Sequence, residues 1–179
     1  MTLTSDDTAN PSGAGDSPLE PDLFPDVRPS DMRAADGTPT FIVPAEDLLE
    51  VLTHLRDEHR FTMLEDVTAV DWKKEPRFQV VYNLLSIERR AVIRLKVNLP
   101  GDNPVVSSAT PVFPGANWYE REVFDLFGIT FTGHPELRRI EMPDDWQGHP
   151  LRKDYPVTGP RRPNLPANQF RPVGRSNSQ

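Results

Sequence analysis

The 179-residue sequence contains no cysteine. The chain therefore forms no disulfide, and it supplies no thiolate to an iron–sulfur cluster or to structural zinc. Long apolar runs are also missing, since no stretch approaches the ~20 residues needed to span a bilayer, and the acidic N-terminus lacks a signal-peptide pattern. We therefore expect a soluble chain on the cytoplasmic side that reaches a membrane only through another protein.

Positive charge is scarce. The chain has 20 Lys and Arg against 27 Asp and Glu, a net charge of −7. A nucleic-acid surface needs a basic patch, and only the C-terminal tail is basic, so we expect no nucleic-acid partner. The sequence also contains no glycine-rich phosphate loop, no nucleophile elbow and no His-x-x-x-His pair. These absences disfavour a freestanding enzyme.

Composition divides the chain into four parts. Residues 1–37 form an acidic arm with eight acidic residues, two arginines and five prolines, and we expect most of it to be flexible. Residues 38–132 are expected to form the folded core, and residues 133–157 an irregular segment. Residues 158–179 form a basic, proline-rich tail with too few aliphatic residues to fold alone.

The core is predicted to be an α+β domain. Short apolar runs predict strands at 40–43, 61–72, 77–86, 91–99 and 105–110, and a leucine stripe after Pro44 predicts a helix. Apolar residues alternate with polar ones along 91–99, which is typical of a sheet with one covered and one wetter face. We therefore predict a small mixed β-sheet with two helices packed on one face, followed by an extended proline-rich C-terminal segment.

The second helix is predicted over residues 117–128. Asn117 is expected at its N-cap with Glu120 reaching back to the Asn117 amide, and Gly128 is expected to end the helix in the left-handed conformation. Charged residues lie off the apolar stripe, and Arg121 and Asp125 have the spacing of an ion pair on the solvated face. The stripe consists of Tyr119, Val123, Leu126 and Phe127.

Residues 133–157 show almost no periodicity. Prolines and glycines interrupt the segment, yet it is too rich in aromatic and aliphatic residues for a disordered region. We expect it to be ordered against something. Two interpretations stay open, a loop that folds back onto its own domain and a surface that docks on a partner, and we favour docking because Trp146, Arg152 and Tyr155 are residue types that anchor interfaces.

The stretch from Glu120 to Pro156 resembles a known family. The residues Glu120-Arg121-Glu122 and Asp125-Leu126-Phe127-Gly128-Ile129 are similar to the signature of the C subunit of proton-translocating NADH-quinone oxidoreductase, respiratory complex I, of the bacterial type. The similarity continues through Gly133-His134-Pro135 and Leu137-Arg138-Arg139-Ile140 to residues 142–156, and more weakly back to about residue 41. Glu141 departs from the pattern, because family members more often carry an aliphatic residue there.

The resemblance implies a non-redox subunit of the peripheral arm on the cytoplasmic face of the cell membrane. It would pack beside the D subunit, which helps to line the quinone cavity, and beside other hydrophilic subunits. The complex is expected to use NADH, FMN, iron–sulfur clusters and a quinone, while this chain itself is expected to bind no cofactor or metal and to hold no catalytic residue. The residues expected to form the family signature or a partner interface are Glu120, Arg121, Glu122, Asp125, His134, Arg139, Trp146, His149, Arg152, Lys153, Asp154 and Tyr155.

Two alternatives remain. The chain could be the homologous subunit of a related hydrogenase or F420H2 dehydrogenase complex, because similar chains occur in those assemblies. A different class is a freestanding metal-dependent enzyme that uses Glu120, Glu122 and Asp125, since carboxylates are the ligands of hard metal ions. The same spacing is also that of a solvated helix face, so the metal-dependent enzyme is the less favoured interpretation.

Overall fold

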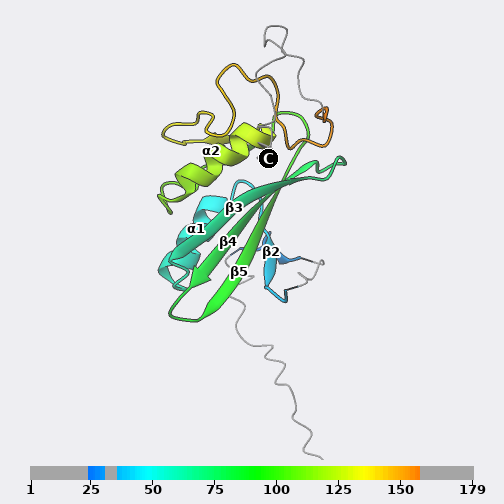
Figure 1. Cartoon of the computed structure of the whole chain (residues 1–179). Coiled ribbons are helices and arrows are strands. Elements are labelled where there is room, and N and C mark those ends of the chain that lie inside the picture. Colours follow the sequence, from blue (N-terminus) through cyan, green and yellow to red (C-terminus); the bar gives the residue numbers. More distant parts are fainter. Residues whose placement is uncertain (1–23, 31–35, 158–179) are drawn as a thin grey trace, which may run out of the picture.

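A five-stranded mixed sheet forms the centre of the molecule in the computed structural model, which describes residues 24–30 and 36–157 (Figure 1). The strands lie in the order β1-β2-β5-β4-β3. Their bounds are Arg28–Pro29 for β1, Thr40–Ile42 for β2, Met63–Asp71 for β3, Phe78–Ser86 for β4 and Ala91–Leu99 for β5. All neighbours pair antiparallel except β2 and β5, which pair in parallel and make the sheet mixed.

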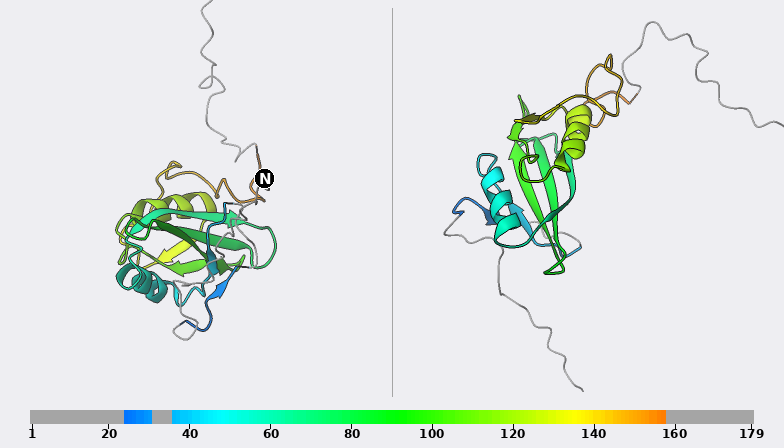
Figure 2. Two further views of the ribbon diagram at one scale, coloured as in Figure 1. Left: turned by 90° about the horizontal axis from the view of Figure 1, so that it is seen from below. Right: turned by 90° about the vertical axis from the view of Figure 1, so that its left-hand side faces the viewer.

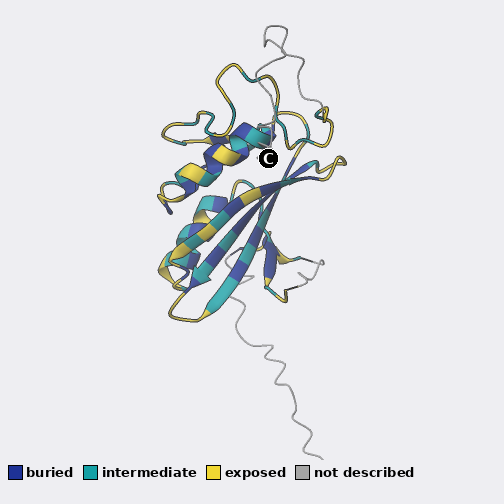
Figure 3. Ribbon diagram, in the orientation of Figure 1, coloured by how far each residue is buried: buried dark blue, intermediate teal, exposed yellow. Residues whose placement is uncertain are grey.

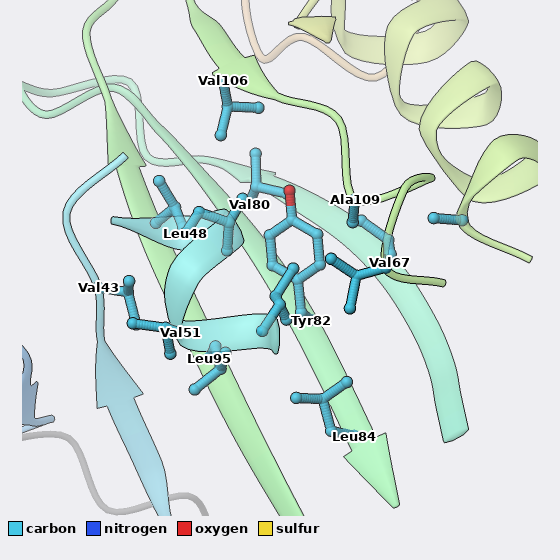
Figure 4. Close-up of a cluster of buried hydrophobic side chains, with 14 of the residues drawn as sticks. Val43, Leu48, Val51, Val67, Val80, Tyr82, Leu84, Leu95, Val106 and Ala109 are labelled. Atoms are coloured by element: carbon cyan, nitrogen blue, oxygen red, sulfur yellow. The ribbon is translucent and has the colours of Figure 1, made fainter. Parts of the chain in front are cut away.

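The β4–β5 hairpin supplies most of the apolar surface of the sheet. Period-two alternation places Val80, Tyr82 and Leu84 on the same face as Ile93 and Leu95, and all five are buried. Figure 4 shows the Tyr82 ring within this cluster, with its hydroxyl group directed toward the side where Val106 and Ala109 lie. The alternation predicted for residues 91–99 is therefore confirmed, including both ends of the strand.

Helix α1 (Leu48–Asp57) covers this apolar face (Figure 4). Its buried stripe is Leu48, Val51, Leu52 and Leu55, which repeats at the spacing of one helix face. The helix begins at Leu48 rather than at Pro44, because residues 45–47 form turns first.

Helix α2 (Ala116–Phe127) lies along the edge strand β3, and the hydroxyl of Tyr119 donates a hydrogen bond of 2.9 Å to the Glu65 carbonyl there (Figure 2). Both helices bury apolar residues in one common core. The predicted α+β fold, a small mixed sheet with two helices, is thus confirmed. The predicted cap is wrong: Gly115 is the N-cap residue, Asn117 lies inside the first turn, and no side chain caps the helix.

Two short strands complete the fold. Strand β6 (Val105–Ser107) pairs in parallel with β7 (Thr130–Thr132), which directly follows α2. Strands β1 and β7 were not predicted from the sequence. Phe24 and Val27, which composition placed in the acidic arm, are buried against the core. The other residues of the arm and the tail at 158–179 lie outside the described residues.

No helix among residues 24–30 and 36–157 is long and apolar enough to cross a bilayer. Residues 133–157, the segment after β7, form no helix or strand. Each residue as a whole is exposed or half-buried (Figure 3), although the side chain of His134 is fully buried.

Candidate functional site

Helix α2 carries three buried charged residues, and the segment at 133–157 is built around it. Glu120, Arg121 and Asp125 were expected on a solvated face, but all three are buried. The stripe that faces the core is Ala116, Glu120, Val123 and Phe127, so the helix is rotated relative to the predicted stripe. The periodicity of apolar residues predicted that the charged side chains face solvent. It could not reveal their hydrogen-bond partners, such as Ser108 and Arg139, because these come from other parts of the chain.

Glu120 fastens α2 to the chain that follows β6. Its carboxylate accepts a hydrogen bond of 2.6 Å from the Ser108 hydroxyl and another of 2.6 Å from the Ala109 backbone N–H. Burial raises the pKa of Glu120 to about 7, although both hydrogen bonds act in the opposite direction. Tyr82 faces the same region. Burial and then the charge of Glu120 raise the pKa of its phenol, whose hydroxyl has no hydrogen-bond partner among the described residues.

His134 lies beside Glu120 but does not neutralise it. The two side chains are fully buried, and Nε2 of His134 is 4.0 Å from the Glu120 carboxylate. Nε2 is 3.1 Å from the Asn117 carbonyl, an acceptor, while Nδ1 accepts the backbone N–H of Glu136 at 3.0 Å. These two contacts select the neutral imidazole protonated on Nε2. The carboxylate of Glu120 therefore has no cationic partner among the described residues.

Asp125 organises the first half of the irregular segment. One of its oxygens accepts three successive backbone N–H groups, from Ile140, Glu141 and Met142, at 2.8–3.0 Å. The other oxygen accepts a hydrogen bond of 2.6 Å from Arg139. Burial opposes ionisation, but the hydrogen bonds outweigh it and hold the pKa of Asp125 below its ordinary value.

The predicted pair between Arg121 and Asp125 is therefore wrong. Arg121 instead stacks its guanidinium 4.9 Å from the centroid of the Trp118 ring and donates to the Arg138 carbonyl at 3.4 Å. The partner of Asp125 is Arg139, which also donates to the Gly148 carbonyl at 3.1 Å and so ties two parts of the segment together.

The second half of the segment covers the C-terminal end of α2. The last carbonyl groups of an α-helix have no hydrogen-bond donors within the helix, so those of α2 need partners from elsewhere. His149 donates to the Asp125 carbonyl at 2.8 Å, the Leu151 N–H donates to the Leu126 carbonyl at 3.0 Å, and Arg152 donates to the next two carbonyls. Burial lowers the pKa of His149, which favours its neutral form.

Gly128 makes this cover possible. It adopts φ of +72°, as predicted for the residue that ends the helix. A Cβ atom at this position would lie 2.5 Å from Nε2 of His149 and 2.6 Å from Nη2 of Arg152. Only glycine therefore lets the segment approach the helix end so closely.

Asp71 at the end of β3 holds the last described part of the segment. Its carboxylate binds the Arg77 guanidinium at 2.9 Å and the backbone N–H groups of Lys73 and Lys153, each at 2.9 Å. The hydrogen bond from Arg77 is the largest cause that lowers the pKa of Asp71 to about 2. Arg77 also pairs with Asp154 at 2.8 Å. Sequence reasoning did not select Asp71, Arg77 or Ser108. The one available signal for Asp71 was a carboxylate at the end of an apolar strand.

The carboxylates of the proposed metal-dependent enzyme do not converge. Glu120 binds the chain after β6, Asp125 binds residues 139–142, and Glu122 is exposed. Burial, Glu141 and Asp66 all raise the pKa of Glu122. Throughout residues 24–30 and 36–157 no group of three His, Cys, Asp or Glu side chains is placed to hold a metal ion. The geometry gives no support to this alternative.

The outer side of the segment forms an apolar hollow of about 500 Å³. Trp146 and Tyr155 are half-buried in its wall, while Leu151 is 50% exposed. Tyr155 packs over Gly148 and donates to the Gln147 carbonyl at 3.1 Å. The other residues that line the hollow are Pro150, Arg152, Lys153, Pro156 and Val157.

The signature residues thus divide into two sets. One set uses its side chains inside the domain, and it consists of Glu120, Arg121, Asp125, His134, Arg139, His149, Arg152, Asp154 and Tyr155. The other set consists of Glu122 and Lys153, which are exposed, and Trp146, which is half-buried in the wall of the hollow. The segment is folded onto its own domain, and it presents an apolar surface on its outer side.

Comparison with known proteins gives a consistent result. Residues 41–161 match the family model described as respiratory-chain NADH dehydrogenase, 30 Kd subunit. The C subunit of NADH-quinone oxidoreductase from Moorella thermoacetica is 48% identical over 133 residues, which cover 74% of this chain and 88% of the relative. The C/D subunit of the same enzyme from Methylococcus capsulatus is 49% identical over 133 residues, 69% of this chain but 23% of that longer protein.

A solved structure resembles the fold. One chain of the membrane-bound sulfane sulfur reductase, an archaeal respiratory membrane complex, superposes with a TM-score of 0.66 at 28% identity. The match covers 76% of this chain and 81% of that one.

Proposed function

Because the chain belongs to the family of the respiratory-chain NADH dehydrogenase 30 Kd subunit, we propose that it is a non-redox subunit in the peripheral arm of a membrane-associated NADH:quinone oxidoreductase. The observation that carries this proposal is the match to the C subunit of the Moorella thermoacetica enzyme along 88% of the relative's length. The complex would couple electron transfer from NADH to quinone with proton translocation.

The chain's own contribution would be architectural. It contains no cysteine, so it cannot ligate an iron–sulfur cluster through thiolates. Its buried carboxylates are occupied by hydrogen bonds that hold the 133–157 segment and the chain after β6. We therefore assign no catalytic, cofactor-binding or metal-binding residue to this chain. NADH, FMN, iron–sulfur clusters and the quinone would be bound by other subunits.

The expected neighbour is the D subunit, which helps to line the quinone cavity. The relative from Methylococcus capsulatus supports this partner, because it is described as a single C/D subunit and therefore joins the two subunits in one polypeptide. The chain would brace the D subunit through the hollow beside Trp146 and Leu151 and thereby keep the distance between cluster and quinone constant. It would sit peripherally on the cytoplasmic face of the membrane and contact lipid only through the complex.

Co-purification tests the assignment. The chain, tagged at its native locus, is isolated from gently solubilised membranes, and the associated proteins are identified by mass spectrometry. We expect the D subunit and the cluster-bearing hydrophilic subunits in the same particle, together with NADH-dependent quinone reduction. A chain that purifies alone, or with a complex that does not oxidise NADH, would contradict the proposal.

Docking through the hollow is tested by one exposed leucine. Leu151→Asp places a charge in the hollow, where burial against a partner would be costly, while the free protein should melt as the wild type does. Ile87→Asp is the matched control, because Ile87 is 69% exposed in the β4–β5 turn. We expect Leu151→Asp to prevent incorporation into the complex and Ile87→Asp to assemble normally. Equal assembly of the two variants would exclude the hollow as the docking site.

The resemblance to a chain of the archaeal sulfane sulfur reductase shows that this fold also occurs in another respiratory membrane complex. The alternative is therefore a homologous subunit of a related hydrogenase or F420H2 dehydrogenase complex. Substrate tests on the purified particle separate the two. Quinone reduction driven by hydrogen or by reduced F420 but not by NADH would favour the alternative.

A further inference from the structure

Lys73 and Lys153 are far apart in the sequence, but their backbone N–H groups lie close together at one corner of the molecule. Asp71 accepts the backbone N–H of Lys73 with one carboxylate oxygen and that of Lys153 with the other, each at 2.9 Å. Because both amides bind one carboxylate, the β3–β4 turn is joined to the end of the irregular segment. Figure 1 shows the turn and the orange end of the described chain at the same end of the molecule.

Three acidic groups at this corner form ion pairs or hydrogen bonds within the domain. Asp71 binds Arg77, which also pairs with Asp154, and the Glu75 carboxylate accepts the Gly101 N–H at 3.0 Å. The ammonium groups of Lys73, Lys74 and Lys153 form no ion pair within the described part of the chain, and all three residues are exposed. Lys73, Lys74, Lys153 and Arg77 together exceed Asp71, Glu75 and Asp154 by one positive charge, on a chain whose net charge is −7.

Apolar surface lies next to these lysines. Trp72 is 40% exposed and Leu151 is 50% exposed, and Val157 is fully exposed at the edge of the 500 Å³ hollow. Lys153 itself lines the hollow. An exposed apolar pocket beside exposed lysines that form no ion pair is typical of an interface whose partner supplies an apolar anchor and acidic neighbours.

We propose that this corner, the lysine seam (Trp72, Lys73, Lys74, Leu151, Lys153 and Val157), binds an acidic segment of a neighbouring subunit that inserts an apolar side chain into the hollow. The inference rests on the proposed function, since it requires a neighbour within a complex. The anchor supplies affinity by burying the exposed apolar surface. The lysines select the partner and its register by pairing with its carboxylates.

Charge reversal tests the seam in the assembled complex. Lys73→Glu/Lys153→Glu replaces two lysines by carboxylates, and Arg28→Glu/Arg90→Glu makes the same change at two exposed arginines in β1 and the β4–β5 turn. The control also matches backbone conformation, because Lys73 and Arg90 both have positive φ, 59° and 51°. We expect retention of the first variant in the NADH-oxidising particle to fall roughly tenfold at physiological ionic strength, and the control to be retained like the wild type. Equal retention of the two variants would overturn the inference.

A photo-cross-linking residue at Lys74 identifies the occupant. In the wild-type background it should capture a peptide of another subunit with a net negative charge. Capture of a neutral or basic peptide, of residues 1–23 of this chain, which are acidic, or of no peptide from an intact complex would overturn the inference and leave the proposed function standing. A wild-type chain absent from any NADH-oxidising particle would instead overturn both.

Discussion

Replacing Glu120 by glutamine should stabilise the protein above neutral pH. The carboxylate is fully buried with two hydrogen-bond donors and no cation to compensate it among the described residues. Glutamine can keep both contacts, because its oxygen accepts the Ala109 N–H and its amide donates to the Ser108 oxygen. The Ser108 hydroxyl can then turn to Thr110, whose oxygen lies 2.8 Å away.

The magnitude follows from the pKa of Glu120, which is about 7 in the folded protein and 4.5 ordinarily. A raised pKa means that the folded state binds the proton more tightly than the unfolded state. The associated stability is present below pH 4.5 and is lost as the pH rises to about 7. The difference of about 2.5 pH units corresponds to about 3 kcal/mol of unfolding free energy, and the glutamine variant does not lose it.

The assay is urea unfolding of both proteins, followed by tryptophan fluorescence from about pH 4.5 to 8.5. The stability difference should grow from near zero at the acidic end to about 3 kcal/mol in favour of the variant at the basic end. Glu122→Gln on the exposed side of the same helix is the comparison. The pKa of Glu122 is also raised, so this variant should gain stability in the same direction, but by less than Glu120→Gln because Glu122 is exposed to solvent. A difference that does not change with pH, or a glutamine variant that is less stable at pH 8.5, would refute the reasoning.

Two further substitutions test the attachment of the irregular segment. Asp125→Asn cannot satisfy Arg139 and three N–H groups together, so it should cost about 3 kcal/mol and make residues 139–152 sensitive to limited proteolysis; a protease-resistant variant of wild-type stability would contradict the assigned role of Asp125. Gly128→Ala combines a strained φ of +72° with contacts of 2.5–2.6 Å to His149 and Arg152, so it should cost more than about 1 kcal/mol. Gly37→Ala, with φ of +73° but no atom within 4 Å, gives the strain alone, and equal costs at the two glycines would show that close packing at Gly128 is unimportant.

Periodic burial was predictable from the sequence, and individual polar partners were not. Strand β5 matched its predicted bounds because five alternating apolar residues face one core. Gly128 ended α2 as predicted, because glycine, which has no Cβ atom, adopts the left-handed conformation without a steric penalty. Strands β1 and β7 have two and three residues, too few to show a period.

The sequence predicted which residues belong to the candidate site, but not which contacts they make. The family resemblance selected Asp125, Arg139 and His149, which the structure brings together at the end of α2. Their roles could not be read from spacing, since Asp125 binds backbone N–H groups that any residue except proline would supply. The burial of Glu120 likewise depends on Ser108, which reaches it from another element.

The attachment of the segment through main-chain groups has an evolutionary consequence. Asp125 holds residues 140–142 by their N–H groups, and the Leu151 N–H meets the Leu126 carbonyl, so these contacts do not depend on which side chains the segment carries. Glu141, where the family resemblance leads us to expect an aliphatic residue, illustrates this: its N–H binds Asp125 while its side chain is exposed. Substitutions on the outer side can therefore accumulate in step with changes in a partner chain, while the path of the backbone is inherited unchanged.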